Sequence, residues 1–568
     1  MREKNGSYNN LHAKTLIHTL YQLGVHTYCL APGSRSTPLA IAIAEHPLCE
    51  KILHFDERGL GFCALGVAKA SSCPVVLVVT SGTAAGNLLP AIMEASESHV
   101  PLILLTADRP PELRSCGSNQ TTDQVKMFDN FVRHQIDLPC PEESIPSKYL
   151  QSALSFAVMK ARSLCPGPVH INCLFREPLF SSEKIADSPY PIPCHYKPII
   201  ATAGDSAFKF YADLLGRVEK GVIVLGAMAE IPNMKPIYEL AKTLEWPIFA
   251  ESTCPVRAHA LPYYEMICRH ASPGRAEAVL HFGDRIVSKV LEQYLGTVEG
   301  PYLLVHPIVD CYDPSYRVTE KCTCAPDLFC EKLLPDLKRK TGSWMNEWKE
   351  KSLSIAEKID TFFSEQSELS EPGLFWQLEQ ASLPGWALFL ANSMPIRDAN
   401  TFFHPKNEIG PLFSNRGLSG IDGNIATVCG ITHARKRPTL AILGDLTSLH
   451  DLNSLALVHK SPHPIVIFIV NNGGGGIFSF LPISEEKEVF EDYFAHRHEY
   501  SFAKAAEMFC LPYTAIARAD DLQRALQLQE KHPHSCIFEL FTDRENNKKI
   551  HQTIHEIVKE SLCLATLP

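Results

Sequence analysis

The chain has 568 residues, of which 45% are hydrophobic and 20% are charged, and its formal net charge is −10. A single hydrophobic core stops growing at roughly 250–300 residues, so these values exclude a one-domain protein, and the apolar content excludes a disordered one. The acidic balance disfavours a nucleic-acid-binding protein, which usually carries a basic face. The 19 cysteines follow no disulfide or zinc-finger spacing, which favours free thiols in a reducing compartment.

The N-terminal segment and the length of the apolar runs together predict the cellular location of the protein. Residues 1–10 are polar and lack the apolar stretch of a signal peptide. The longest apolar runs are far shorter than the ~18 residues that suggest a membrane span. We therefore expect a cytoplasmic protein.

Short apolar runs rich in β-branched residues recur along the chain, and each is followed by a loop and a helix-like stretch. Several are continuously apolar rather than alternating, which is typical of strands buried on both faces of a parallel sheet. The fold class is therefore α/β with several doubly wound parallel sheets. The predicted strands are Val75–Thr80, Pro101–Thr106, Val222–Leu225, Ala278–Phe282, Tyr302–Val305, Ala387–Leu390, Leu440–Leu443 and Ile465–Val470.

Two segments indicate domain boundaries. Residues 181–198 contain four prolines and no helical period, which indicates a linker. Residues 338–348 are polar and charged before a helix-like stretch, and we expect them to open a third domain. The predicted domains are residues 1–182, 195–335 and 345–568. Residues 57–70 and residues 420–434 resemble each other faintly, because both are rich in Gly and Ala at helical spacing; we call this similarity the echo. Such small residues permit close approach of two helices.

The third domain contains a pair of polar groups that follow neighbouring buried strands. Strand Leu440–Leu443 ends in Gly444-Asp445, and strand Ile465–Val470 ends in Asn471-Asn472 followed by four glycines, which places Asn472 27 residues after Asp445. The spacing is about one βαβ step, so both groups are expected at carboxyl ends of parallel strands, where ligands bind. Carboxylate, amide and carbonyl oxygens suit Mg²⁺, and consecutive glycines let the backbone approach a diphosphate. The alternative is an ordinary glycine-rich loop after a strand.

This arrangement resembles the diphosphate-binding motif of thiamine-diphosphate enzymes. The resemblance implies a metal ion, Mg²⁺ or Mn²⁺, held by Asp445, Asn472 and the carbonyl group of Gly474. The family commonly has a third Asn where this chain has Gly473. A Glu placed like Glu57, just before the Gly- and Ala-rich helix expected at 59–70, hydrogen-bonds the pyrimidine ring in that family and promotes loss of the thiazolium C2 proton. Without the motif, Glu57 would be read as a helix N-terminal carboxylate.

Several loops narrow the resemblance to the 2-succinyl-5-enolpyruvyl-6-hydroxy-3-cyclohexene-1-carboxylate synthase family. They are residues 31–39 (APGSRSTPL), 80–84 (TSGTA), 105–114 (LTADRPPELR), 117–121 (GSNQT), 392–397 (NSMPIR) and 415–423 (NRGLSGIDG). The likeness is thin in the middle domain, where only residues 283–285 (GDR) and Lys289 look familiar. Val290 stands where some members have Arg.

The resemblance implies a set of site residues. The cofactor would contact Glu57, Ser81, Gly82, Thr83, Ile421, Gly444, Asp445, Leu446, Asn472, Gly474, Gly475, Ile477 and Phe478. The substrates would contact Ser34, Arg35, Arg109, Asn119, Gln120, Lys289, Asn392, Ser393, Arg397 and Arg416. Catalytic roles would fall to Glu57, Arg35, Gln120, Ser393, Arg397 and Arg416. Arginine suits this task because its planar, permanently charged group pairs with carboxylates, although any one of these arginines could form an ordinary surface ion pair.

The implied domains are a pyrimidine-binding, a central and a diphosphate-binding domain. The implied reaction decarboxylates 2-oxoglutarate and adds the succinyl carbon to isochorismate, in menaquinone biosynthesis. A homodimer or a dimer of dimers is implied as well, with active sites at the subunit interface. Three alternatives are another thiamine-diphosphate decarboxylase or carboligase, a catalytically silent protein of the same fold, and a nicotinamide dehydrogenase. The last is disfavoured because the chain has no well-placed Gly-x-Gly-x-x-Gly motif.

Overall fold

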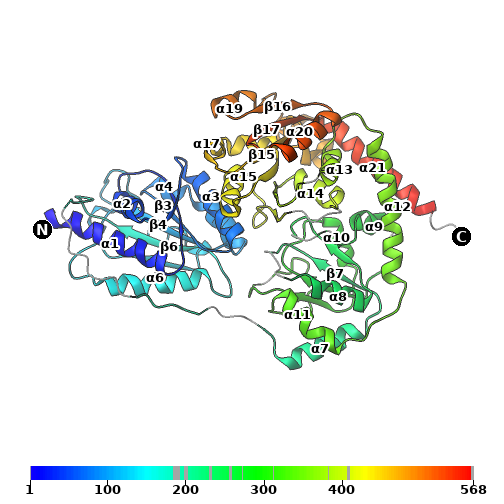
Figure 1. Cartoon of the computed structure of the whole chain (residues 1–568), viewed down its shortest axis with the longest axis horizontal. Coiled ribbons are helices and arrows are strands. Elements are labelled where there is room, and N and C mark those ends of the chain that lie inside the picture. The colour runs from blue at the N-terminus through cyan, green and yellow to red at the C-terminus, as the bar shows by residue number, and fades with distance from the viewer. Residues whose placement is uncertain are drawn as a thin grey trace. The chain divides into compact units, whose positions relative to one another are not determined.

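The computed structural model of the chain describes residues 2–182, 192–197, 202–228, 233–254, 257, 259–270, 273–310, 312–381, 383–405 and 410–564. Within these residues the strands form three sheets, and all paired strands run parallel. Helices connect the strands of each sheet (Figure 1). The predicted α/β class with parallel sheets is confirmed.

The first sheet has the strand order β2-β1-β3-β4-β6-β5. Every residue of β3 and β4 is buried, as expected for strands covered on both faces. Its strands are β1 (Thr27–Leu30), β2 (Glu50–Leu53), β3 (Val75–Val79), β4 (Leu102–Asp108), β5 (His134–Asp137) and β6 (Val169–Leu174). The helices of this part are α1 (Arg2–Gln22), α2 (Thr37–Glu45), α3 (Glu57–Ser71), α4 (Thr83–Gly86), α5 (Leu89–Glu97) and α6 (Ser147–Ala161).

The second sheet has the order β11-β10-β9-β7-β8. Its strands are β7 (Gly221–Leu225), β8 (Ile248–Ala250), β9 (Ala278–Phe282), β10 (Tyr302–Val305) and β11 (Glu320–Cys322). The helices of this part are α7 (Asp205–Gly216), α8 (Lys235–Leu244), α9 (Tyr264–His270), α10 (Lys289–Leu295) and α11 (Pro326–Leu333).

The third sheet has the order β13-β12-β14-β15-β17-β16, so its strands follow one another across the sheet in the same pattern as those of the first. This shared topology supports the similarity between the first and third domains that the Gly- and Ala-rich echo only hints at. The strands are β12 (Ala387–Leu390), β13 (Leu412–Phe413), β14 (Thr439–Gly444), β15 (Ile465–Asn471), β16 (Tyr513–Ile516) and β17 (Cys536–Phe541). The helices are α12 (Trp344–Ser364), α13 (Glu371–Gln380), α14 (Met394–Phe402), α15 (Asn424–Arg435), α16 (Asp445–His450), α17 (Leu455–Lys460), α18 (Lys487–Val489), α19 (Ala503–Met508), α20 (Ala519–Lys531) and α21 (Arg544–Leu564).

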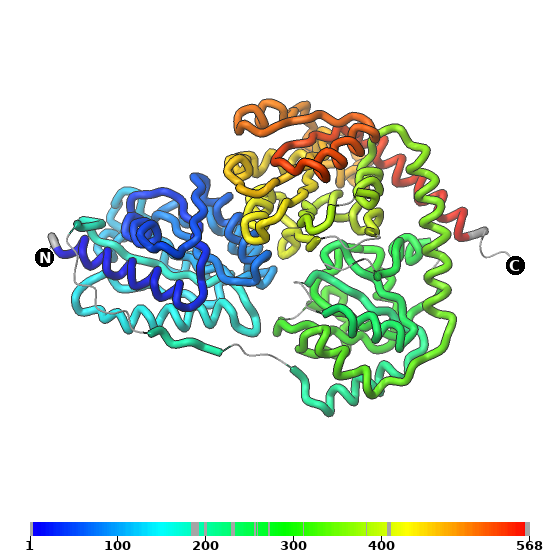
Figure 2. The backbone as a smooth tube through the Cα atoms, viewed as in Figure 1, coloured from blue at the N-terminus to red at the C-terminus, as the bar shows by residue number. Residues whose placement is uncertain are grey.

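The two segments of the echo, α3 and α15, pack directly against each other (Figures 1 and 2). Their glycines lie where one helix backbone meets the other. A Cβ atom added at Gly66 would lie 2.1 Å from the carbonyl oxygen of Thr427, and one added at Gly430 would lie 2.0 Å from that of Cys63. Glycine at these two positions therefore allows a helix separation that any larger residue would prevent.

By its internal contacts the chain divides into two compact units. The first unit comprises residues 1–199, 415–436 and 450–463, and the second comprises residues 200–414, 437–449 and 464–568. The second unit contains two sheets because one hydrophobic core runs through both of them. Trp348 is fully buried in this core, with its ring centroid 4.9 Å from that of Phe249 in β8, and its helix α12 also contacts α21.

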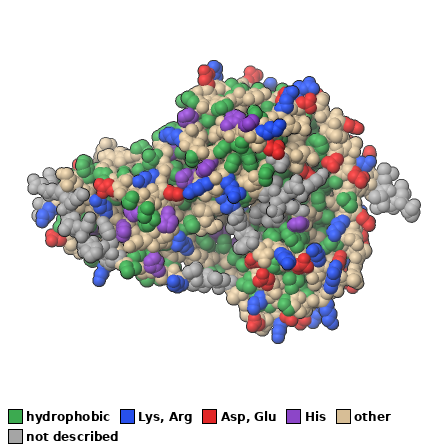
Figure 3. Space-filling model, in the orientation of Figure 1, with side chains coloured by type: hydrophobic (Ala, Val, Ile, Leu, Met, Phe, Trp, Pro, Cys, Tyr) green, Lys and Arg blue, Asp and Glu red, His purple; other side chains and the backbone are tan. Residues whose placement is uncertain are grey.

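The ends of the three sheets are compatible with the predicted domains, but the boundaries at 1–182, 195–335 and 345–568 stay predictions. The predicted linker lies largely outside the described residues, which omit 183–191 and 198. Among the described helices, none is both long enough and apolar enough to cross a bilayer. On the face drawn in Figure 3, the described Lys, Arg, Asp and Glu side chains are interspersed, without a broad patch of one sign.

Candidate active site

The predicted metal ligands meet at one edge of the third sheet. Asp445 is the first residue of α16, directly after β14, and Asn472 directly follows the neighbouring strand β15. Oδ2 of Asp445 accepts a hydrogen bond from the backbone N–H of Gly474 at 2.9 Å, and Oδ1 accepts one from Leu446 at 2.6 Å. The structure thus brings the carboxylate and the glycine run together, as the βαβ spacing predicts.

The side-chain amide of Asn472 has one end satisfied and one end open. Its Nδ2 donates to Oε1 of Glu371 at 2.8 Å, whereas its Oδ1 is buried without a hydrogen-bond partner in the part of the chain that the structure describes. A buried acceptor without a partner is unfavourable by about 1–3 kcal/mol. Coordination of a cation by Oδ1 would remove that penalty.

Within the glycine run, Gly474 lies too close to a neighbouring backbone for a side chain. Gly474 has φ +143°, and a Cβ atom there would lie 2.3 Å from the carbonyl oxygen of Ala495. The next residue, Gly475, donates its N–H to the same carbonyl group at 2.6 Å. Gly473 has φ +71°, a left-handed conformation that glycine adopts freely and Asn tolerates better than most residues. The backbone conformation at Gly473 is therefore one that an Asn could also adopt.

The donor set of this edge fits a hard divalent cation. Asp445 offers a carboxylate that is only 2% exposed, Asn472 offers an open amide oxygen, and Gly474 offers a carbonyl oxygen. Burial raises the pKa of Asp445, against the effect of the hydrogen bonds from Gly474 and Leu446. A bound cation would favour the ionised form. Gly444 ends β14, and Ile477 and Phe478 lie in the short 3-10 helix Gly476–Phe480 that follows the run.

Two side chains that the sequence did not single out support these ligands. Glu371, the first residue of α13, is 3% exposed and contacts Asn472, and burial together with nearby Asp398 raises its pKa to about 7. Nε2 of the buried His498 lies 3.3 Å from Oδ2 of Asp445. Ser370 before Glu371 is a recognisable helix N-cap, but no sequence signal points to a contact across 101 residues.

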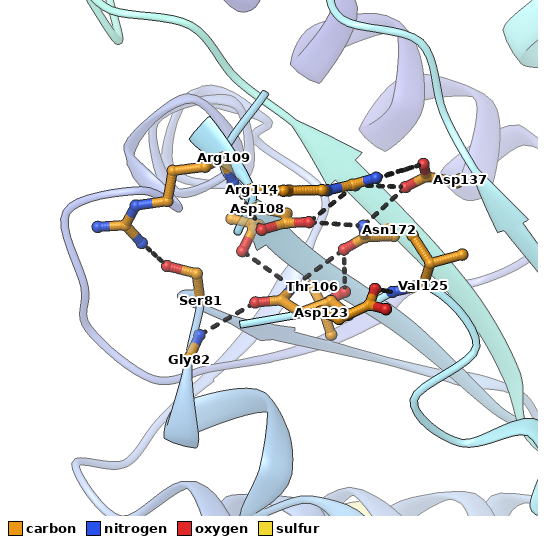
Figure 4. A network of polar contacts seen from close by, with 12 residues as sticks. Ser81, Gly82, Thr106, Asp108, Arg109, Arg114, Asp123, Val125, Asp137 and Asn172 are labelled. Carbon is orange, nitrogen blue, oxygen red and sulfur yellow. Dashed lines mark hydrogen bonds and ion pairs between the residues drawn. The ribbon is translucent and has the colours of Figure 1, made fainter. Parts of the chain in front are cut away.

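In the first unit, two buried arginines lie close to the loop that follows β3. Arg35 donates to the carbonyl oxygen of Phe175 and to Glu177, both at 3.0 Å. Arg109 directly follows β4 and donates to the hydroxyl group of Ser81 (Figure 4). It also donates to the carbonyl oxygen of Gln120 at 2.6 Å. Burial lowers the pKa of Arg109, and the positive charge of Arg35 lowers it further. The carboxylates of Asp108 and Glu177 act in the opposite direction and raise this pKa. Buried guanidinium groups of this kind are suited to binding carboxylates.

A neighbouring network fixes the end of β4. The buried carboxylate of Asp108 accepts hydrogen bonds from the backbone N–H of Arg109 at 2.7 Å, from Arg114 at 3.0 Å and from Asn172 at 3.0 Å. Figure 4 shows Arg114 between Asp108 and Asp137, while the side chain of Arg109 points away toward Ser81. Arg114 therefore has a structural role, and Arg109 is directed to the predicted site.

The loop after β3 and the segment around Gln120 hold each other. Ser81 donates to the carbonyl oxygen of Gln120 at 3.1 Å, and the side-chain amide of Gln120 donates back to the carbonyl oxygen of Ser81 at 3.2 Å. Gly82 has φ +82° and donates its N–H to Gln124 at 3.0 Å. The remaining predicted residues of these loops, Ser34, Thr83 and Asn119, are exposed.

Glu57 is the first residue of α3 and is partly buried. The prediction placed it before a helix at 59–70, but the helix begins at Glu57 because Asp56 caps it by accepting hydrogen bonds from the N–H groups of Arg58 and Gly59. Ile421 lies three residues before α15, the helix against which α3 packs. The position of each residue is thus tied to the glycine contact between these helices.

The segment that carries Arg416 is held by a buried carboxylate. Glu94 of α5, 3% exposed, accepts hydrogen bonds from the backbone N–H of Gly417 at 2.9 Å and of Leu418 at 2.7 Å. Lys69 lies 3.7 Å from Glu94 and donates to Asn415 at 3.1 Å. Sequence reasoning missed Glu94, because nothing in α5 distinguishes it from an ordinary surface carboxylate.

In the second unit, Asn392 and Ser393 precede α14. Ser393 has φ +75°, and its carbonyl oxygen accepts a hydrogen bond from Arg397 at 2.5 Å. The other end of α14 is anchored by the buried Arg257, which donates to the carbonyl groups of Ala399 and Asn400, both at 2.8 Å. Lys289 is exposed at the first position of α10, a helix that Ser288 caps.

The predicted residues therefore fall into two groups, which the structure defines separately. The first unit holds Ser34, Arg35, Glu57, Ser81, Gly82, Thr83, Arg109, Asn119, Gln120, Arg416 and Ile421. The second unit holds Lys289, Asn392, Ser393, Arg397, Gly444, Asp445, Leu446, Asn472, Gly474, Gly475, Ile477 and Phe478. Contacts within each group are described above, and the site roles stay predictions.

Family sequence profiles match all three parts of the chain. The profile described as "Thiamine pyrophosphate enzyme, N-terminal TPP binding domain" matches residues 12–127, and thiamine pyrophosphate is another name for thiamine diphosphate. "Middle domain of thiamine pyrophosphate" matches residues 212–390. "Thiamine pyrophosphate enzyme, C-terminal TPP binding domain" matches residues 397–540.

Curated relatives match nearly the whole chain, and several carry the same name, 2-succinyl-5-enolpyruvyl-6-hydroxy-3-cyclohexene-1-carboxylate synthase. The protein of Salinibacter ruber is 36% identical over 97% of this chain and 97% of its own length. That of Rubrobacter xylanophilus is 36% identical over 98% and 99%, and that of Aeromonas salmonicida is 35% identical over 93% and 94%. The chain therefore belongs to the 2-succinyl-5-enolpyruvyl-6-hydroxy-3-cyclohexene-1-carboxylate synthase family of thiamine-diphosphate enzymes.

Proposed function

We propose that this chain is a transferase that forms 2-succinyl-5-enolpyruvyl-6-hydroxy-3-cyclohexene-1-carboxylate and CO₂ from 2-oxoglutarate and isochorismate, in menaquinone biosynthesis. The observation that carries the proposal is the match to synthases of this name over 97% of the chain. The buried oxygen ligands at the edge of the third sheet support it, because a silent relative would have no need to retain them.

Thiamine diphosphate, when bound, supplies the electron sink that lets a 2-oxo acid lose CO₂ and its acyl carbon join an acceptor. Asp445, Asn472 and the carbonyl group of Gly474 would hold Mg²⁺ or Mn²⁺ beside the diphosphate. Glu57 would form a hydrogen bond with the pyrimidine ring, and Ile421 would support the cofactor through apolar contact.

Both proposed substrates carry two carboxylates, and the buried arginines are suited to them. Arg35 and Arg109 present neighbouring buried guanidinium groups, whose planar donors pair well with carboxylates. Ser81 and Gln120 hold Arg109 in place through the contacts described above. When the arginines hold the substrate carboxylates, the reacting carbons of the two substrates stay close together and correctly oriented. Such positioning supplies much of the rate in two-substrate reactions.

The proposal includes the assembly and the location. We expect a homodimer or a dimer of dimers, with each active site built from two subunits, in the cytoplasm. The three domains at 1–182, 195–335 and 345–568 would serve as pyrimidine-binding, central and diphosphate-binding domains.

The test is an absorbance assay of isochorismate consumption by the purified chain with thiamine diphosphate, Mg²⁺ and 2-oxoglutarate, omitting one component at a time. Consumption that requires every component, with a succinyl adduct found by mass spectrometry, is the expected result. CO₂ release from 2-oxoglutarate without isochorismate consumption would replace the proposal with another thiamine-diphosphate carboligase. Absence of reaction with any 2-oxo acid would favour a silent protein.

A further inference from the structure

Whether Asn472 can bind a cation depends on which end of its side-chain amide faces the proposed metal site. An amide presents an oxygen at one end and an NH₂ group at the other, and the two ends have nearly the same shape. Only the oxygen can bind a cation. Sterics alone cannot select the required orientation, so a hydrogen-bond partner on one end must do so.

Glu371 is that partner. Its Oε1 accepts a hydrogen bond from Nδ2 of Asn472 at 2.8 Å. When the carboxylate is ionised, the reverse orientation would place two acceptor oxygens against each other. The observed orientation leaves Oδ1 of Asn472 buried and without a partner among the described residues. The single hydrogen bond to Glu371 thus both occupies Nδ2 of Asn472 and leaves Oδ1 available to a cation.

Glu371 is itself fixed from several sides. It is the first residue of α13, whose N-cap Ser370 accepts a hydrogen bond from the N–H of Gly373 at 3.1 Å. The hydroxyl group of Thr542 donates to the same Oε1 at 3.3 Å. Thr542 in turn donates its backbone N–H to the carbonyl oxygen of Asn471 at 3.1 Å, next to the proposed ligand. Glu371 therefore joins the start of α13 to the ends of β15 and β17.

We propose that Glu371 is a positioning residue that holds the Asn472 amide with its oxygen toward the metal ion. The inference rests on the proposed metal site at Asp445, Asn472 and Gly474. The proposal gives Glu371 a role toward the amide and not toward the ion, since its Oε1 already accepts two hydrogen bonds. Partners of this kind commonly change metal affinity by about 10–100-fold.

The test compares three full-length variants. Glu371→Gln keeps an oxygen that can accept from Asn472, Glu371→Leu keeps the volume without an acceptor, and Thr542→Val removes the second contact of Glu371 while leaving the first. Free Mn²⁺ is measured by electron paramagnetic resonance in a titration with saturating thiamine diphosphate, and circular dichroism checks the fold of each variant.

The expected result is a loss of Mn²⁺ affinity of about 10–100-fold in Glu371→Leu, with Glu371→Gln and Thr542→Val within about threefold of the wild type. Equal affinity in Glu371→Leu and the wild type would overturn the proposal. So would equal losses in Glu371→Leu and Glu371→Gln, which would assign the effect to charge. A wild type that binds no Mn²⁺ would remove the metal site and this inference with it. A wild type that binds Mn²⁺ without consuming isochorismate would refute only the proposed substrates.

Discussion

The contact between α3 and α15 gives a sharp prediction for Gly66→Ala. An alanine Cβ would lie 2.1 Å from the carbonyl oxygen of Thr427, and an ordinary contact begins near 3.4 Å. The Cβ atom is fixed to the backbone of α3, and the carbonyl oxygen belongs to the backbone of α15, so no side chain can rotate away. The helices must separate by about 1.3 Å, which opens gaps along the whole contact.

Overpacking of this kind usually destabilises a protein by about 1–3 kcal/mol, and the rigid backbone contact places Gly66→Ala near 3 kcal/mol. For a unit of this size that loss lowers Tm by roughly 6–12 °C. The assay is thermal unfolding followed by circular dichroism at one protein concentration.

Gly86→Ala is the matched control, because Gly86 ends α4 in the same unit and an added Cβ there would meet no atom within 4 Å. Its Tm should stay within about 2 °C of the wild type. Equal Tm values for the two variants would show that α3 and α15 do not approach each other as described, and would refute the packing argument.

Three further predictions concern single carboxylates. Glu57→Gln should lower isochorismate turnover by at least about 100-fold with Tm unchanged, and unaltered turnover would remove Glu57 from the mechanism. Asp445→Asn should weaken Mn²⁺ binding by more than roughly 100-fold in the paramagnetic resonance titration, and wild-type affinity would exclude it as a ligand. Burial raises the pKa of the Glu251 carboxyl group to about 7. The folded protein therefore binds the carboxyl proton more tightly than the unfolded chain does. This contribution to the free energy of unfolding is complete below about pH 4 and is lost as the pH rises through 7. In urea denaturation between pH 5 and 8, the difference in unfolding free energy between the wild type and Glu251→Gln should therefore change by up to about 3 kcal/mol, whereas parallel curves would contradict the assignment.

The central strands could be predicted from sequence because burial on both faces leaves a continuous apolar run. Ala278–Phe282, Tyr302–Val305 and Ala387–Leu390 match β9, β10 and β12 residue for residue. Edge strands could not be found this way. Strand β2 has exposed polar positions and β13 has only two residues, so neither produces a recognisable pattern.

The helix predicted after Asp445 shows why local pattern is insufficient. The structure splits it into α16 and α17 with a 3-10 turn between them. The buried side chain of Asp451 occupies the break, accepting hydrogen bonds from the backbone N–H of Ala426 at 2.9 Å and the hydroxyl group of Ser454 at 2.7 Å. A contact with another helix therefore decides where α16 ends.

The same distinction applies to the candidate site. Asp445 and Asn472 could be found because a short motif places them on adjacent strands. Glu371, His498 and Glu94 could not, because each acts on a residue far away in sequence and has no motif of its own. Sequence therefore predicts the members of a motif more readily than the groups that hold them in place.

The two compact units are interleaved along the chain, and this limits how the protein can be divided. Residues 1–199 include the whole first sheet, but α15, which covers α3, is encoded more than 200 residues later. A fragment ending at residue 199 would expose the glycine-rich face of α3 to water, together with the apolar side chains around it. During synthesis on the ribosome, that face of α3 must likewise stay uncovered until residue 435 has emerged. The first unit therefore cannot finish folding until much of the second half of the chain has been made.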